Sequence, residues 1–476
     1  MKLKRFKVVV TLMMMCLLLS NTMGAYAKDD PPKKVLLVGA GLRDITPTVE
    51  NGILPLTRTS AGNVTSTLGG NLDPLHVRVI ALSDGTNKSL FVSFDLSNVP
   101  GATVFLPALA KHAGLPKEAI FFTASHAHAT VNVPAEIDTS TDYGKRMKRF
   151  SDKIMGQMLA AADEALANMQ PATVGIGYSE SYVNVNRNNP YEEVTKDGDI
   201  IKHNYLGYNG SGISEKTVSA VRFDSLKGEP IAFIINYPVH AVVMHNNTIA
   251  DGNIAISADL PGFVSTNLEK KFDGAVAVWT SGAAGDQNPI LMTEMYYPNA
   301  ETGGFELKNT GWADLLTYLG SIHYRDVMNA VNAITDVTSN VSIKYAYGTT
   351  TVPGRSVTVE TTDGDSIGKL DKYSYSEGKS FKLGIQVLRI GDIAYAGFPG
   401  ELFNAHGLYI KENSTIKDMI VVNKVAQSDG VDYRYIPDDY SLEHGGFRAL
   451  AAGFKPGYVS PSLSILTNKL IDKTNK

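Results

Sequence analysis

Short apolar runs recur along this chain of 476 residues, and most of them are followed by a polar or glycine-rich turn. These runs have the length of β-strands and cover residues 35–38, 77–82, 90–94, 120–122, 231–235 and 276–279. Between them, apolar residues recur at spacings of three and four, as in Met147, Phe150 and Ile154, which predicts amphipathic helices. This alternation predicts an α/β or mixed α+β fold in which helices flank β-sheets.

The rest of the chain gives no sign of a second domain. We find no internal repeat and no low-complexity linker. Two polar segments, residues 296–311 and 358–379, are expected to be surface insertions, because no change in composition follows either of them. We therefore expect a single large domain over residues 36–476.

The first 27 residues have the pattern of a secretory signal peptide. A positively charged stretch over residues 2–7 precedes an apolar stretch over residues 8–20, and Ala-Tyr-Ala at 25–27 matches a cleavage site. We expect cleavage near Ala27, a short tail over residues 28–35, and secretion. A retained membrane anchor is the alternative, although the apolar stretch is short for a membrane span.

Composition narrows the chemistry that the mature chain can use. The only cysteine, Cys16, lies in the predicted signal peptide, so the mature protein would contain no disulfide. A metal site would then have to use His, Asp, Glu or Tyr. The formal net charge is −4 and 19% of the residues are charged, which argues against a nucleic-acid-binding surface.

Four segments combine an apolar strand with a polar turn that carries candidate catalytic residues. These residues are His126 and His128, His240 and His245, Asp286 and Asn288, and Glu401 and His406. Residues i and i+2 of a strand point to the same face, so His126 and His128 could reach one site. Catalytic zinc is bound by histidine and carboxylate ligands, with one position left for water. One of these two histidines, together with His240 and Glu401, would supply such a set.

Each of these features also has a purely structural interpretation. A histidine at a strand end is often only hydrogen-bonded, and Glu401 would fit the first turn of a helix that opens after Pro399. Asp286 would fit the cap of a helix that follows a strand. Residues 432–440 would fit a solvated loop, and Arg187 would fit the surface, where most arginines lie.

The order of these segments resembles the N-terminal catalytic domain of neutral/alkaline, non-lysosomal ceramidases. The segments that carry the resemblance are GAGLRDITP from residue 39, DPLHVR from residue 73, VSFD ending at Asp95, SHAHAT from residue 125, NVNR at 184–187, His240 with the following ISADLPG, GDQNPI at 285–290, Pro-Gly-Glu at 399–401 and YRYIPDDY at 433–440. They run in the family's order from about residue 36 to about residue 445.

The resemblance implies a metallohydrolase domain with a zinc site. Its ligands would be His126, His240, Glu401 and Tyr433, and Tyr435 competes with Tyr433 for the fourth position. Zinc would lower the pKa of a bound water to about 7 and polarise the carbonyl under attack.

The same resemblance implies roles for three residues beside the metal. His128 would exchange a proton with the zinc-bound water or the leaving amine, and Arg187 would hold the substrate or the developing oxyanion. Asn288 stands where the family carries a serine, and its amide can donate a hydrogen bond to an oxyanion. The family's additional C-terminal β-sandwich-like domain is not expected in a chain that ends at Lys476. Both departures put ceramide itself in question as the substrate.

These observations predict a secreted, zinc-dependent amidohydrolase that cleaves an N-acyl amide, ceramide-like or otherwise. One alternative keeps the zinc and changes the bond to an ester or lactone of a carbohydrate or small metabolite. The other is a non-catalytic binding protein on the same fold. We expect a small-molecule or lipid substrate, transient contact with a membrane surface, and no nucleic-acid partner.

Overall fold

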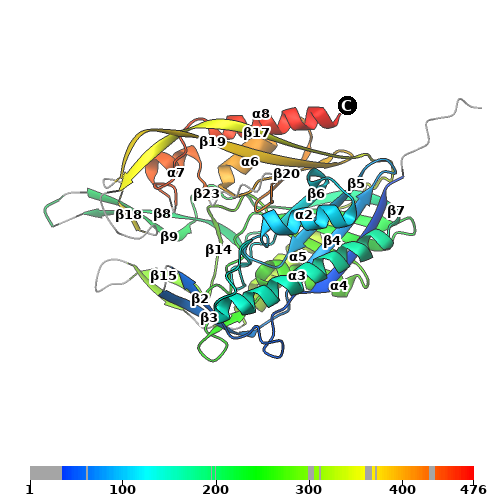
Figure 1. The fold of residues 1–476 in the computed structure, drawn as a ribbon. Coiled ribbons are helices and arrows are strands. Elements are labelled where there is room, and N and C mark those ends of the chain that lie inside the picture. The colour runs from blue at the N-terminus through cyan, green and yellow to red at the C-terminus, as the bar shows by residue number, and fades with distance from the viewer. Residues whose placement is uncertain are drawn as a thin grey trace, which may run out of the picture. The chain divides into compact units, whose positions relative to one another are not determined.

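Two large β-sheets pack face to face in a computed structural model of the chain, and helices cover their outer faces (Figure 1). The structure describes residues 35–60, 63–194, 196–198, 200–298, 305–309, 312, 314–359, 367–369, 373–427, 435–446 and 448–475. These residues belong to one unit, Val35–Lys476. The predicted signal peptide and all but the last residue of the predicted tail lie outside the described residues.

The larger sheet has eight strands, and most of the predicted apolar runs lie in it. In sheet order they are β13 (Val276–Ser281), β11 (Pro230–Tyr237), β10 (Thr217–Ser225), β7 (Gln170–Glu180), β1 (Leu37–Asp44), β4 (His76–Ser83), β5 (Lys88–Phe94) and β6 (Ile120–Ala124). The first predicted run is displaced, because β1 begins at Leu37 and extends through the Gly-Ala-Gly segment.

Close packing explains the glycines of β1. A Cβ atom at Gly39 or Gly41 would lie 2.1 Å from a backbone oxygen of the long helix α3 (Asp142–Ala167). Only glycine lets the strand and the helix approach so closely.

The second sheet is smaller and is antiparallel except at one edge. Its strands are, in sheet order, β17 (Ile343–Val359), β19 (Tyr373–Ile390), β20 (Ile393–Gly397) and β22 (Asp418–Val422). Four minor sheets complete the described strands: β12 (Ile254–Ile256) with β3 (Asn63–Asn71) and β2 (Leu56–Ser60); β14 (Gln287–Pro289) with β8 (Asn184–Val194), β9 (Ile200–Asn209) and β18 (Ile367–Lys369); β15 (Glu294–Pro298) with β16 (Phe305–Asn309); and β21 (Glu401–Leu402) with β23 (Tyr435–Ile436).

The helices fall into two groups that pack on opposite sides of the sheet pair. The first group packs on the larger sheet and contains α2 (Ala102–Ala113), α3, α4 (Asp259–Lys271) and α5 (Leu315–Asn332). The second packs on the smaller sheet and contains α6 (Asn404–Glu412), α7 (Asp439–His444) and α8 (Val459–Thr474). A short 3-10 helix, η1 (Lys117–Ala119), leads into β6.

Alternate residues of the central strands enter different cores. In β4, Val77 and Val79 face the helices, whereas Ile80 and Leu82 face the second sheet. A strand buried on both faces needs apolar residues at nearly every position, which is why these strands appear in the sequence as continuous apolar runs. The predicted mixed α/β fold, with sheets flanked by helices, is confirmed.

The predicted helical periodicity is also confirmed. The apolar residues of α3 at spacings of three and four, from Met147 to Ala165, are all buried. Within the described residues, no helix is both long and apolar enough to cross a membrane. The two predicted insertions contribute strands where they are described: residues 296–311 overlap the β15–β16 hairpin, and residues 358–379 overlap β17, β18 and β19.

We expect Phe121→Ala to lower the free energy of unfolding by about 3–5 kcal/mol, because it opens a cavity between the two sheets. The Phe121 ring lies 4.7 Å from the Phe91 ring and 6.0 Å from the Tyr395 ring, centroid to centroid. Urea unfolding measures the change. Ile465→Ala, at a residue 69% exposed on α8, is the control and should change stability by less than about 0.5 kcal/mol. Equal effects of the two substitutions would contradict this account of the core.

Candidate metal centre and catalytic site

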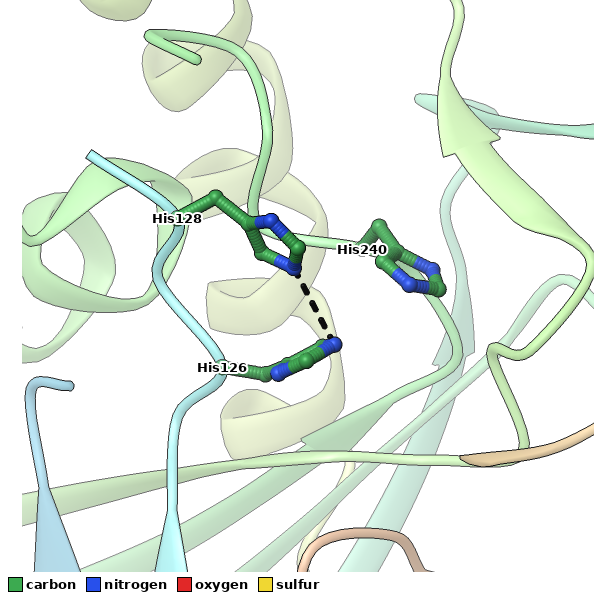
Figure 2. A group of neighbouring side chains, drawn as sticks. All are labelled: His126, His128 and His240. Carbon is green, nitrogen blue, oxygen red and sulfur yellow. Dashed lines mark hydrogen bonds between the residues drawn. The ribbon is translucent and has the colours of Figure 1, made fainter. Parts of the chain in front are cut away.

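The two histidines of the SHAHAT segment meet because the chain makes a left-handed turn between them and the strand. Strand β6 ends at Ala124, and His126 has φ 67°. The backbone N–H of His128 then donates to the carbonyl of Ala241, 2.9 Å away. The two Nε2 atoms lie 3.1 Å apart (Figure 2). Their predicted closeness is confirmed, but its cause is this turn and not the alternation of a strand.

A third histidine completes the group from another strand end. His240 follows β11, and its ring centroid lies 4.9 Å from that of His126 and 5.6 Å from that of His128 (Figure 2). Each of the three offers a ring nitrogen, and these nitrogens all lie within 4.8 Å of one another.

Backbone carbonyls fix the orientation of two of these rings. The Nδ1–H of His126 donates to the carbonyl of Ser97 at 2.5 Å, and that of His240 donates to the carbonyl of Ala284 at 2.7 Å. A neutral imidazole with its proton on Nδ1 has a lone pair on Nε2. This outer hydrogen bond is the arrangement that metal-binding histidines usually have.

Glu401 joins the histidines through a two-residue strand. It lies in β21, which pairs in parallel with β23 so that Glu401 is opposite Tyr435. Its Oε2 is 3.0 Å from the Nε2 of His240 and 3.4 Å from the Nε2 of His126. The interpretation of Glu401 as a first-turn helix residue is wrong, because α6 begins only at Asn404 and has no acidic residue in its first turn.

The second carboxylate oxygen of Glu401 contacts a lysine that we did not predict. The Nζ of Lys424 lies 3.1 Å from Oε1, and both side chains are buried. Burial raises the pKa of Glu401, but opposing effects, of which the charge of Lys424 is the largest, hold the pKa well below its usual value. Glu401 is therefore a carboxylate at neutral pH.

No proton lies between the Nε2 of His240 and the Oε2 of Glu401. Burial, followed by the positive charge of Arg187, lowers the pKa of His240 to about 3, and its single ring proton is on Nδ1. The Nε2 lone pair and the carboxylate oxygen thus face each other as two acceptors at 3.0 Å. A cation between them would turn this unfavourable contact into a favourable one.

The spacing of the donor atoms fits a zinc ion. Zinc bound at about 2.0–2.1 Å by tetrahedral ligands places neighbouring donors roughly 3.3 Å apart. The Oε2 of Glu401 lies 3.0 Å from the Nε2 of His240 and 3.4 Å from the Nε2 of His126. The Nε2 atoms of His126 and His128 are 3.1 Å apart. Burial and then the neighbouring histidines hold the pKa of His128 well below 6.5, so its imidazole is also neutral. The three histidines could hold a metal ion. Glu401, with one oxygen near both His126 and His240, could take the place of His128 in such a site.

Arg187 lies beside this cluster and is buried, so its interpretation as a surface arginine is wrong. Its Nη2 donates to the carbonyl of Gly285 at 2.6 Å, and its Nη1 donates to the Oδ1 of Asn288 at 3.3 Å. Strands β8 and β14 pair here, which brings Arg187 and Asn288 together from opposite strands. The guanidinium carbon lies 5.3 Å from the centroid of the Tyr435 ring.

Asp286 does cap a helix, although not the one expected. The residues directly after Asp286 form a strand and not a helix, because β14 begins at Gln287. Its Oδ1 accepts from the N–H of Asn404 at the start of α6, and its Oδ2 accepts from the Nδ2 of Asn186. Burial, followed by the charge of Asp438, raises the pKa of Asp286 to about 7.

The predicted tyrosine ligand, Tyr433, lies outside the described residues and stays a prediction. Its competitor Tyr435 is described, and its ring stacks on that of His240 with 6.4 Å between the centroids. Burial, followed by the charge of Glu401, raises the pKa of the Tyr435 hydroxyl.

The two remaining histidines of the four segments differ in their positions. His406 is turned away, with Nδ1 2.6 Å from the Oγ of Ser460 and Nε2 2.9 Å from the carbonyl of Pro437. The ring of His245 lies 5.6 Å from that of His128, and its Nδ1 lies 3.2 Å from the Oε2 of Glu294.

Several residues of the ceramidase-like motifs stabilise the fold around the site. Arg78 donates to the Oδ2 of Asp95 at 2.6 Å, in a buried ion pair between β4 and the end of β5. Asp73 accepts from the Oγ of Ser257 and from the N–H of Ala258, which fixes the chain before α4. These contacts connect motifs that are far apart in the sequence.

Lys424 could have been found by the rule that located the other residues. It follows the apolar strand β22, just as His126, His240 and Glu401 follow β6, β11 and β20. The backbone carbonyls that orient the imidazoles leave no signal in the sequence.

Comparison with solved structures identifies the fold as that of ceramidases. The chain aligns with the crystal structure of the neutral ceramidase from Pseudomonas aeruginosa over 92% of its own length and 74% of that chain, with 16% identity and a TM-score of 0.63. A ceramidase structure described as complexed with C2 gives the same coverage and identity and a TM-score of 0.62. No family model matches the chain. The predicted resemblance is therefore confirmed at the level of the fold.

We expect about one divalent metal ion per chain. His126→Ala and His240→Ala should each lose this ion, because each removes a nitrogen from the cluster. Glu401→Gln should also lose metal, whereas His128→Ala should retain it. Elemental analysis by mass spectrometry measures the metal content of each purified variant.

The control for these variants is His112→Ala, at a partly exposed histidine on α2 outside the cluster. Its metal content should equal that of the wild type. If His128→Ala loses the metal and Glu401→Gln retains it, the ligand set is the three histidines without the glutamate.

Proposed function

We propose that this protein is a secreted zinc-dependent hydrolase that cleaves an N-acyl amide bond. The observation that carries the proposal is the convergence of the His126 and His240 nitrogens on a Glu401 oxygen, with two acceptors facing each other at 3.0 Å. The shared fold with neutral ceramidases supports the class of reaction. Secretion rests on the signal-peptide pattern of the sequence alone.

The zinc ion would supply a hydroxide at neutral pH and polarise the carbonyl of the substrate. His126, His240 and Glu401 would hold it, together with a tyrosine from residues 433–435. Metal ligands need neutral imidazoles and ionised carboxylates, and His240 and Glu401 are in these protonation states.

His128 is placed to move protons within the site. Its Nε2 is 3.1 Å from the Nε2 of His126, at the edge of the cluster. An amine leaving group must gain a proton before it departs, and a histidine beside the scissile bond can donate it. His128 would first accept the proton of the attacking water and then donate it to the leaving nitrogen.

Arg187 and Asn288 would stabilise the oxyanion that forms during attack. The contact with Arg187 occupies the Oδ1 of Asn288, so the amide offers its N–H groups to the substrate. Arginine presents a rigid fork of donors, which suits a developing negative charge. The substrate would be a small N-acyl compound or a lipid reached by transient contact with a membrane surface.

A panel of amides and esters tests the reaction class. The zinc-loaded protein should hydrolyse N-acyl amides and should hydrolyse a fluorescent ceramide analogue poorly, because Asn288 cannot replace the family's serine hydroxyl. Asn288→Ser should raise ceramide hydrolysis, measured as kcat/KM.

Ester or lactone turnover without amide turnover would favour the alternative hydrolase, and zinc without any turnover would favour a binding protein. Efficient ceramide hydrolysis by the wild type would show that the serine is dispensable.

Arg187→Lys should lower kcat/KM by about 10²–10³-fold, because the lysine keeps the charge but loses the fork of donors. Zinc content and melting temperature should stay near the wild-type values. Steady-state kinetics on the best amide substrate, elemental analysis and thermal melting make the three measurements. A variant that keeps most of the wild-type efficiency removes Arg187 from the catalytic residues, and one that unfolds assigns it a structural role.

A further inference from the structure

A cavity of about 260 Å³ is lined by Lys424, which contacts Glu401, and by segments next in sequence to residues of the candidate metal site. Its wall includes Asn98, which follows the Ser97 carbonyl that orients His126. On another side it includes Pro399, which precedes Gly400 and Glu401. The cavity and the metal cluster thus share two segments of chain, and a group bound in one would lie close to the other.

Lys424 stands between the cavity and the cluster. It lines the cavity, and its Nζ is 3.1 Å from the Oε1 of Glu401. Its backbone is in the left-handed region, with φ 57°, where a residue other than glycine is strained. The hydrogen bonds of its own N–H to Gly400 and of the next N–H, that of Val425, to Phe398 hold it there. The fold therefore fixes a buried ammonium group at this position.

The described residues of the cavity wall carry positive charge and no negative charge. Within the described part of the chain, Lys424 is the one charged side chain that lines the cavity, and Asn98, Thr103 and Asn132 are neutral hydrogen-bonding residues. The first turn of α2, which begins at Ala102, also lines the cavity and contains no acidic residue. A helix N-terminus adds a partial positive charge.

Metal binding would make this excess larger. Glu401 carries one negative charge, and one of its oxygens contacts Lys424 while the other faces the histidines. A divalent metal on the second oxygen, together with a bound hydroxide, would leave two negative charges to balance the three positive charges of an ammonium and a dication. Buried charge is costly unless a counter-charge lies close to it.

We propose that the cavity binds a carboxylate of the substrate next to Lys424, so that the substrate is a small N-acyl amide that carries a carboxylate. The inference rests on the proposed amide hydrolysis and narrows its substrate class. A volume of about 260 Å³ is slightly below the usual range of roughly 300–1,000 Å³ for small-molecule sites, so the cavity has room for a short polar group. Asn98 and Asn132 offer amide donors to the carboxylate oxygens.

Two matched pairs of amides test the charge preference. In the first pair, N-butanoylglycine carries the carboxylate on the amine side of the amide, and its glycinamide analogue is uncharged. In the second pair, N-succinyl ethanolamine carries the carboxylate on the acyl side, and N-butanoyl ethanolamine is uncharged. The wild type should favour the carboxylate member of at least one pair by about tenfold or more in kcat/KM. Lys424→Met should bring that ratio close to one, and Lys424→Arg should keep most of it. Lys148→Met, at an exposed residue of α3, should leave the ratio unchanged.

A binding measurement keeps the test independent of turnover. Calorimetry with butyrate and with 1-butanol on the zinc-loaded wild type should show tighter binding of butyrate, and Lys424→Met should weaken butyrate binding. If Lys424→Met does not fold, two measurements remain. The first compares butyrate with 1-butanol on the wild type. The second uses Asn98→Leu, which removes an amide donor from the cavity wall and should weaken butyrate binding.

The outcomes separate the two proposals. Lys424-dependent butyrate binding without hydrolysis of any amide supports the carboxylate site and overturns the proposed function. Amide hydrolysis without a charge preference in either pair overturns the carboxylate site and leaves the proposed function intact. Butyrate binding that is unchanged in Lys424→Met is binding to the metal alone and also overturns the site.

Discussion

The packing of the two large sheets against each other decides where the other parts of the molecule lie. The apolar core between them holds residues from β4, β5 and β6 on one side and from β19, β20 and β22 on the other. At the edge of this core the strand ends are joined across the sheets. The N–H of Ala426 donates to the carbonyl of Phe122, and the N–H of Asn423 donates to the carbonyl of Ser281. Loops that follow strands of different sheets are thereby held side by side, and the candidate site is made of these loops.

Much of this arrangement could be predicted from the sequence, because burial on both faces leaves a strong signal. Strands such as β4 and β5 are continuous apolar runs, and the buried stripe of α3 has a regular helical spacing. Candidate catalytic residues were expected in the polar turns that follow apolar strands, and His126, His240 and Glu401 all lie in such turns. Residue type and position relative to a strand made His240, Glu401 and either His126 or His128 candidates, and only the resemblance to ceramidases favoured His126 over His128.

The parts that could not be predicted depend on backbone geometry and on contacts between distant segments. Nothing in the sequence marks His126 as a left-handed residue, yet this turn brings its imidazole to that of His128. The pairing of Glu401 with Tyr435 joins two-residue strands that are too short to leave a pattern. Lys424 was missed for a related reason: its importance comes from the carboxylate beside it, and one lysine after an apolar run resembles any surface lysine.

The hydrogen bonds that orient His126 and His240 have a consequence for how freely the sequence can vary. Both acceptors are main-chain carbonyls, those of Ser97 and Ala284, and every amino acid supplies a carbonyl. A substitution at either position changes the side chain but leaves the acceptor in place as long as the backbone keeps its path. The orientation of the two imidazoles therefore depends on the folded backbone. A substitution can change this orientation only if it alters the backbone or replaces one of the two histidines.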